Sequence, residues 1–384
     1  MKKHFMKLSL VALAFATILA TSCGKDDDVD NNDEHAAVVA EQFVDHTVAP
    51  TYTALADATE RLADQLAELR ANPNEGLMRE ACATFLEARA WWEKSEAFLF
   101  GAAGDFGIDP HIDSWPLAET EFNNLMNSPL VLQSLDGDEG DVNAGLNLGN
   151  NLLGFHGIEY ILFQNGQPKS VASLEEKHLI YIAAVAGDLR NRCYQLEVGW
   201  LGEQAPQSHI DKLDEVELAY TVAGSDLSYG ENMKRAGRAG SIYSSRMAAV
   251  IAMAQGCSDI ADEVGSSKIY AAWHGEDITY IESPYSYMSI TDFTNNIISI
   301  QNVWLGGIEG ERSTGRSLRQ FVADIDADLA AKVDAAIELA LTKIAEMPAP
   351  FSLHYSDAKN GEAVEACAEL SEVFGEVIDA LRIN

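Results

Sequence analysis

The stretch Met78–Gly101, MREACATFLEARAWWEKSEAFLFG, decides the fold class. Its apolar residues recur at the spacing of an amphipathic helix, namely at Cys82, Phe85, Leu86, Trp92 and Leu99. A glycine then closes the pattern, as is common where helices end. The spacing therefore predicts a helix that buries one face and ends near Gly101.

The same periodicity continues on both sides of this stretch, without runs of alternating polar and apolar residues. We expect helices over residues 38–69 (interrupted at Pro50), 146–163, 173–200, 231–263, 291–305, 317–347 and 361–381. The Gly- and Asp-rich residues 101–115 and the residues 273–288 are expected to be loops. This pattern predicts an all-α fold of two helical bundles, residues 36–205 and 206–384, with a site between them.

A faint internal repeat is consistent with two related halves. The segment Ser95–Gly101 can be aligned with Ile300–Gly306, and both end at a glycine. Such a short match also arises by chance. If the halves are pseudo-symmetric, Glu96 in the first half corresponds to Gln301 in the second.

The first 22 residues have the composition of a signal peptide. Three lysines precede an apolar run, Leu8–Ala20, which is shorter than the ~18–20 residues that span a bilayer. Small residues then precede Cys23, as in a lipobox, so we expect cleavage before Cys23 and acylation of its thiol. A short transmembrane anchor is the alternative.

The acidic residues 23–35 are expected to form a solvated tether after this anchor. Alternatively, a short acidic run after the lipidated cysteine is a sorting signal for surface export in Gram-negative lipoproteins. We therefore expect an exported protein held by its lipid in the outer membrane, either exposed on the cell surface or facing the periplasm.

The net charge of the full chain is −34, which disfavours nucleic acid as a partner. Four cysteines follow Cys23 at wide spacings and form no C-x-x-C pair: Cys82, Cys193, Cys257 and Cys367. On apolar helix faces they are expected to be buried free thiols. One or two disulfides remain the alternative in an exported chain.

One candidate site lies in the segment Gly154–Glu159, GFHGIE. On a helix, His156 and Glu159 are three residues apart and share a face, so an imidazole and a carboxylate can meet one metal ion. The spacing alone does not decide this, because the pairs His274/Asp277 and His354/Asp357 have the same spacing. A hydrogen-bonded histidine without further role is the alternative.

Two other segments carry acids in unusual surroundings. Arg89, Glu93 and Glu96 fall along one stripe of an aromatic-rich helix, where buried acids are costly unless they are paired. An internal Arg89–Glu93 pair is the simpler interpretation. The segment 108–116, IDPHIDSWP, adds Asp113 and a histidine in a loop, although Asp-Pro is also ordinary turn chemistry.

These segments together resemble the imelysin family of iron-regulated, insulin-cleaving-type proteins. The resemblance spans about residues 36–382 and rests on four ordered blocks: GFHGIE at 154–159, WEKSEAFLFG at 92–101, IDPHIDSWP at 108–116 and NNIISIQNVWLG at 295–306. It implies an all-helical fold of two halves with a site between them. It also implies a metal site formed by Glu96, Asp113, His156 and Glu159, with Arg89 and Glu93 supporting those ligands.

The resemblance implies lipoproteins or periplasmic proteins made under iron limitation, so we expect a metal cargo: iron, or alternatively zinc or manganese, with haem as a further candidate. An outer-membrane iron transporter would be the partner. A metallopeptidase is the second hypothesis, although Tyr160 follows Glu159 and the second histidine of H-x-x-E-H is missing. A surface scaffold protein with a structural polar cluster is the third.

Overall fold

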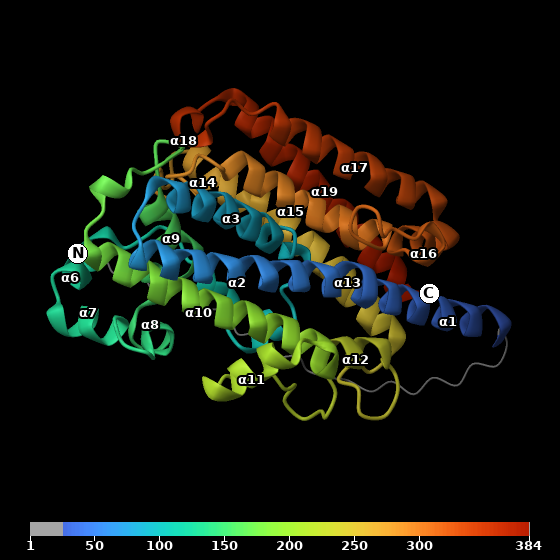
Figure 1. Cartoon of the computed structure of the whole chain (residues 1–384). Coiled ribbons are helices and arrows are strands. Elements are labelled where there is room, and N and C mark those ends of the chain that lie inside the picture. Colours follow the sequence, from blue (N-terminus) through green and yellow to red (C-terminus); the bar gives the residue numbers. More distant parts are fainter. Residues whose placement is uncertain (1–25, 384) are drawn as a thin grey trace, which may run out of the picture.

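The computed structural model describes residues 26–383, and the predicted all-α fold is confirmed (Figure 1). In this part of the chain, the only strands are β1 (Phe163–Gln164) and β2 (Gln167–Pro168), which pair in a two-stranded hairpin. The signal peptide and Cys23 lie outside the described residues. No helix in the described part is long and apolar enough to cross a membrane.

A single long helical rod opens the chain, formed by α1 (Asp26–Phe43), the π-helical turn η1 (Val44–Val48) and α2 (Ala49–Ala71). The acidic segment expected to be a tether is therefore helical from Asp26. The expected interruption at Pro50 takes the form of this π-turn, after which α2 begins with Pro50 in its first turn. Proline has no N–H to donate to the carbonyl of His46, and that carbonyl instead accepts the N–H of Ile308 at 2.8 Å.

The first half of the chain packs around α2, α3 (Glu75–Glu93) and α10 (Glu176–Leu201). Asn74 caps α3 by accepting the N–H groups of Gly76 and Leu77. The expected loop at 101–115 contains two short helices. The smaller elements are η2 (Glu96–Phe98), α4 (Ala102–Asp105), α5 (Ile108–Ile112), α6 (Glu119–Met126), α7 (Pro129–Leu135), α8 (Gly140–Asn147), η3 (Asn150–Leu152), α9 (Gly154–Leu162), η4 (Val171–Ser173), η5 (Gly202–Gln204) and α11 (Gln207–Glu215).

The second half packs around α13 (Arg246–Glu263), α15 (Ser289–Leu305), α17 (Ala327–Ala345) and α19 (Ala358–Ile383). The single helix expected over 231–263 is divided, because Gly237 and Gly240 adopt positive φ after the short helix α12 (Tyr229–Lys234). The remaining elements are the π-turn η6 (Val264–Ile269), α14 (Tyr270–Trp273), η7 (Thr314–Arg316), α16 (Leu318–Ile325) and α18 (Phe351–His354).

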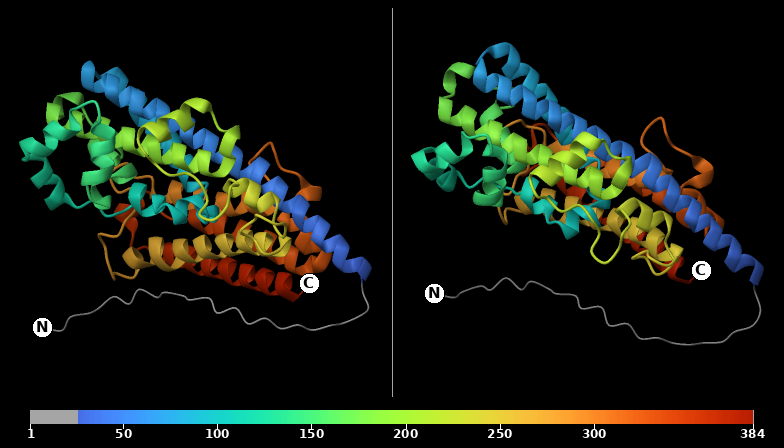
Figure 2. Two further views of the ribbon diagram at one scale, coloured as in Figure 1. Left: turned by 90° about the horizontal axis from the view of Figure 1, so that it is seen from below. Right: turned by 60° about the horizontal axis from the view of Figure 1, so that its bottom comes forward.

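Buried apolar side chains from both halves form one continuous core. In Figure 1, α2 and α10 lie side by side across the molecule, and α17 and α19 form its opposite edge. Figure 2 shows that α1 projects from the bundle at the end where the C-terminus lies. All four described cysteines are buried free thiols, as expected.

The two halves approach most closely where α13 crosses η2. A Cβ atom built on Gly256 of α13 would lie 2.1 Å from the carbonyl oxygen of Ala97. The backbones therefore touch, which only glycine permits at this position. Just beside this contact, the N–H of Ala97 donates to Ser299 Oγ of α15 at 3.0 Å.

Replacing this glycine should separate the halves. We expect Gly256→Ala to lower the free energy of unfolding by about 1–3 kcal/mol, because α13 must move away from η2. Gly375→Ala is the matched control: this glycine also lies inside a helix, but its added Cβ meets nothing within 4 Å. There the helix propensity of alanine should raise stability by about 0.5–1 kcal/mol. Urea denaturation measures the free energy of unfolding of both variants. Equal changes in Gly256→Ala and Gly375→Ala would contradict a close contact at Gly256.

Candidate metal centre

A buried arginine lies at the centre of the site. Arg89 of α3 is 2% exposed, and its guanidinium forms ion pairs with carboxylates from four places in the chain. These partners are Glu93 one turn later in α3, Asp113 after α5, Glu282 in the segment before α15, and Asp292 in α15, the last at 3.8 Å from Nε. The face of Phe155 covers Arg89, with Cζ 5.2 Å from the ring centroid. Such a charge is tolerated only because it is paired in this way.

A second buried cation, Lys268, lies on the π-turn η6. Its Nζ is 3.2 Å from Glu282 Oε1, 3.8 Å from Glu93 Oε2 and 3.9 Å from Glu96 Oε1. Burial raises the pKa of both Glu93 and Glu96 well above the ordinary value, although Arg89 and Lys268 oppose this shift. Asn296 of α15 steadies Glu93 by donating to its carboxylate at 2.5 Å.

Asp113 joins the cations to the aromatic core. Trp92 Nε1 donates to its Oδ2 at 2.7 Å, and Arg89 donates to its Oδ1. Burial alone would raise the pKa of Asp113, but Arg89 and His156 together lower it below the ordinary value. Asp113 is therefore a fixed negative charge in the middle of the site.

His156 and Glu159 lie on one face of α9, as their spacing predicts. Nδ1 of His156 is 3.4 Å from Glu159 Oε2, and Nε2 is 3.1 Å from Asp113 Oδ1 without the alignment of a hydrogen bond. Although burial would lower the pKa of His156, its contacts with Asp113 and Glu159 raise it to about 9. Glu159 is itself fixed, since Oε1 accepts the N–H groups of Tyr285 and Ser286 and the Ser286 hydroxyl at 2.8–3.1 Å.

A strained turn places α9 against α5. Gly154 has φ +63°, and a Cβ atom there would lie 1.9 Å from the carbonyl oxygen of Ile112. The residue after Ile112 is Asp113, so this contact brings α9 to within reach of the Asp113 carboxylate. Opposite it, Ser283 and Tyr287 also have positive φ, at 50° and 63°, in the segment that carries Glu282.

Two sets of potential metal ligands share Asp113. The first comprises Asp113, His156 and Glu282, and the second Glu93, Glu96 and Asp113; within each set the ligand atoms lie within 4.8 Å of one another. One imidazole with carboxylates suits iron, zinc or manganese. Glu282 Oε2 and His156 Nε2 are buried without a hydrogen-bond partner, so the first set fits a metal ion that replaces the imidazole proton at Nε2.

Of the first set, His156 lines a cavity of about 420 Å³. Its walls are mainly aromatic and apolar. They are formed by Trp115, Pro116, Leu117, Glu119, Thr279, Ile281, Pro284 and Tyr285. The second set lies behind Lys268, whose Nζ is 5.3 Å from the Trp115 ring centroid. An incoming ligand would therefore meet His156 first.

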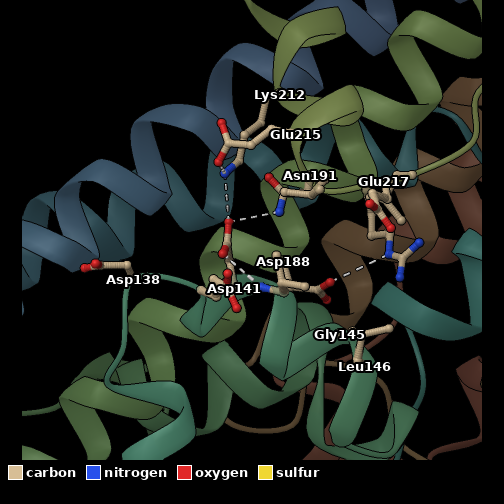
Figure 3. Close-up of a pocket in the computed structure, with 14 residues that line it drawn as sticks. Asp138, Asp141, Gly145, Leu146, Asp188, Asn191, Lys212, Glu215 and Glu217 are labelled. Carbon is tan, nitrogen blue, oxygen red and sulfur yellow. Dashed lines mark hydrogen bonds and ion pairs between the residues drawn. The ribbon is translucent and has the colours of Figure 1, made fainter.

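Another cavity of about 420 Å³ lies between α8, α10 and α11 (Figure 3). Its charged side chains mostly pair with one another: Asp141 Oδ2 accepts Asn191 at 3.1 Å and is 3.4 Å from Lys212 Nζ. Asp188 at its base contacts His111 Nε2 at 2.7 Å. His111, the histidine of the IDPHIDSWP segment, therefore holds α5 against α10 and is not part of the buried cluster.

The family model for imelysin matches residues 48–377. The chain belongs to the imelysin family. It is 25% identical to iron-regulated protein A of Synechococcus elongatus, over 84% of this chain and 79% of that protein.

Solved structures agree with this assignment. A crystal structure described as an iron-regulated protein A precursor from Parabacteroides distasonis superposes with a TM-score of 0.76 at 27% identity, covering 91% of this chain and 95% of that one. An imelysin-like protein from Psychrobacter arcticum has a TM-score of 0.64 at 12% identity, covering 95% and 98%, and so shares the fold.

All six residues singled out from the sequence lie in this cluster, but their positions differ. Asp113 and His156 face each other, Glu96 lies on the Lys268 side, and Glu159 is held by hydrogen bonds behind His156. Arg89 and Glu93 are paired, as the simpler interpretation predicted. Three residues of the cluster were not predicted from the sequence: Glu282, Lys268 and Asp292. Only Glu282-Ser283-Pro284 carried a signal, as an acid beside a turn within an apolar stretch.

Asp109, in the first turn of α5, makes the stability of the site depend on pH. Burial, followed by repulsion from Asp113 and Glu263, raises its pKa to about 7. Between about pH 4 and 7 the unfolded chain has lost this proton while the folded chain keeps it, so stability falls as pH rises. Asp109→Asn should therefore become more stable than the wild type by on the order of 1–3 kcal/mol at pH 8, and equal to it near pH 4.

Asp277→Asn should show the opposite pH dependence of stability to Asp109→Asn. Thermal denaturation across the same pH range measures both variants. Hydrogen bonds from Thr279 lower the pKa of Asp277. Its carboxylate therefore contributes stability above about pH 4, which the asparagine variant should lack. If both variants changed stability by a constant amount at every pH, the assigned shifts would be wrong.

Proposed function

We propose that this protein binds a metal ion, most readily iron, as cargo for uptake. The observation that carries the proposal is the buried imidazole of His156, which lies between Glu159 on one side and Asp113 and Glu282 on the other. Glu159 would orient Nδ1, leaving Nε2 for the metal, as carboxylate–histidine–metal arrangements do elsewhere. The two relatives named for iron regulation support iron as the cargo.

The chemistry of the cluster favours a free ion over haem. Carboxylate atoms of Asp113 and Glu282 lie within 4.8 Å of the His156 ligand nitrogen and can complete the coordination of a free ion. A peptidase would need a base near the metal. In the described cluster Asp113 and Glu282 would serve as ligands and the Ser286 segment holds Glu159, so none of these acids is left as the base.

Metal titration of the chain from residue 24 onward tests the proposal. The wild type should bind Fe²⁺, Mn²⁺ or Zn²⁺, and His156→Ala or Glu282→Gln should weaken binding by at least about tenfold to a hundredfold. His354→Ala is the matched control, since His354 has the same spacing to an acid but is exposed, and its affinity should equal that of the wild type.

The alternatives give different results in the same assay. Equal metal binding by the wild type and His156→Ala would reject the proposed site. A melting temperature that neither metal nor haem changes would favour a scaffold. A haem absorption band lost in His156→Ala would indicate haem as the cargo. Metal-dependent cleavage of an unfolded protein, abolished by both site variants, would favour the peptidase.

We also propose that a lipid on Cys23 anchors the protein in the outer membrane, exposed on the cell surface or facing the periplasm, beside a transporter that receives the metal. The composition of residues 1–35 supports this proposal. Cys23→Ser should move the protein from the membrane fraction to the soluble fraction, because acyl chains supply the binding energy. Retention in the membrane fraction would argue instead for a transmembrane anchor.

A further inference from the structure

We propose that Lys268 sets the charge selectivity of the metal site, by weakening the binding of trivalent cations more than that of divalent ones. The inference rests on the proposed metal binding and adds a specificity-determining residue to it. Lys268 is not one of the metal ligands; its role would be electrostatic.

The position of Lys268 places its charge beside a proposed metal ligand. Its Nζ is 3.2 Å from Glu282 Oε1, and Glu282 belongs to the ligand set that His156 and Asp113 complete. An ion bound to Glu282 would therefore lie only a few ångströms from the ammonium group. Lys268 is 1% exposed, so water does little to screen the repulsion between them.

The turn that carries Lys268 keeps its side chain inside the cluster. The π-turn η6 directs it inward, where Glu93 and Glu96 lie within 4 Å and Trp115 covers it from the cavity side. Two members of the second ligand set, Glu93 and Glu96, therefore lie beside this same ammonium group. Lys268 is thus a resident cation in a cluster whose carboxylates would otherwise attract a highly charged ion.

The repulsion between Lys268 and a bound ion scales with the charge of that ion. At an effective dielectric constant of about 20 and a separation of about 5–6 Å, one further unit of charge changes the affinity on the order of a hundredfold. The affinity ratio between two ions of different charge therefore reports on Lys268, whereas a general loss of structure would weaken both ions alike.

Titrations with Mn²⁺ and Tb³⁺ test this inference in the wild type and in Lys268→Met. The methionine keeps much of the side-chain length and removes the charge. The ratio of Tb³⁺ to Mn²⁺ affinity should rise by tenfold or more. An unchanged ratio in a variant that still binds Mn²⁺ would overturn the inference while leaving the proposed metal site intact. A wild type that binds neither ion would instead overturn the proposed function.

Lys343→Met is the matched control. Lys343 pairs with Glu346 at 3.1 Å and Glu362 at 2.7 Å on the surface, far from the cluster in sequence and structure. Its loss changes the net charge by the same amount and should leave the ratio unchanged. If both variants raised the ratio equally, the total charge of the protein would be responsible, and the role assigned to Lys268 would be wrong.

Lys268→Gln keeps the inference testable if Lys268→Met fails to fold. Glutamine also removes the charge, but its amide can still donate a hydrogen bond to Glu282, which Lys268 Nζ approaches at 3.2 Å. The Tb³⁺ to Mn²⁺ affinity ratio should rise as in Lys268→Met, and an unchanged ratio would overturn the inference.

Discussion

The guanidinium of Arg89 is the constraint on which the rest of the structure depends. A buried cation must find partners, and those of Arg89 come from α3, from the residue after α5, from the segment before α15 and from α15 itself. The two halves of the chain can close their common core only in an arrangement that brings these carboxylates together. Apolar burial supplies most of the driving force, but the charge fixes which surfaces meet.

The same cluster contains more carboxylates than Arg89 and Lys268 can neutralise. Burial raises the pKa of Asp292 to about 7, and it raises the pKa values of Glu93 and Glu96 as well. An excess of buried acids at the end of a cavity is poorly suited to a purely structural role, since apolar residues would pack there at lower cost. This excess of buried acids is the reason for proposing an additional cation, with His156 as its one nitrogen ligand.

The sequence predicts local features of this protein better than its long-range contacts. Helix periodicity gave the all-α fold, and the spacing of His156 and Glu159 correctly placed them on one face. The helix break after Lys234 was missed because Gly237 and Gly240 act through backbone conformation, which apolar spacing does not report. At Pro50 the helix is interrupted only by a π-turn, because the carbonyl of His46 accepts the N–H of Ile308, more than 250 residues away. Lys268 and Glu282 enter the site only through tertiary packing. No local pattern marks Lys268, and Glu282 is marked only by its position beside a turn.

The buried thiols have a consequence for how the chain survives oxidation. Disulfide exchange proceeds through the thiolate, and burial raises the pKa of Cys82, Cys193 and Cys367 to about 12. In the folded protein these thiols are therefore slow to react, whereas the unfolded chain exposes all four described sulfurs to wrong pairing. In an oxidising compartment, the rate of folding relative to thiol oxidation would then decide the yield of native protein.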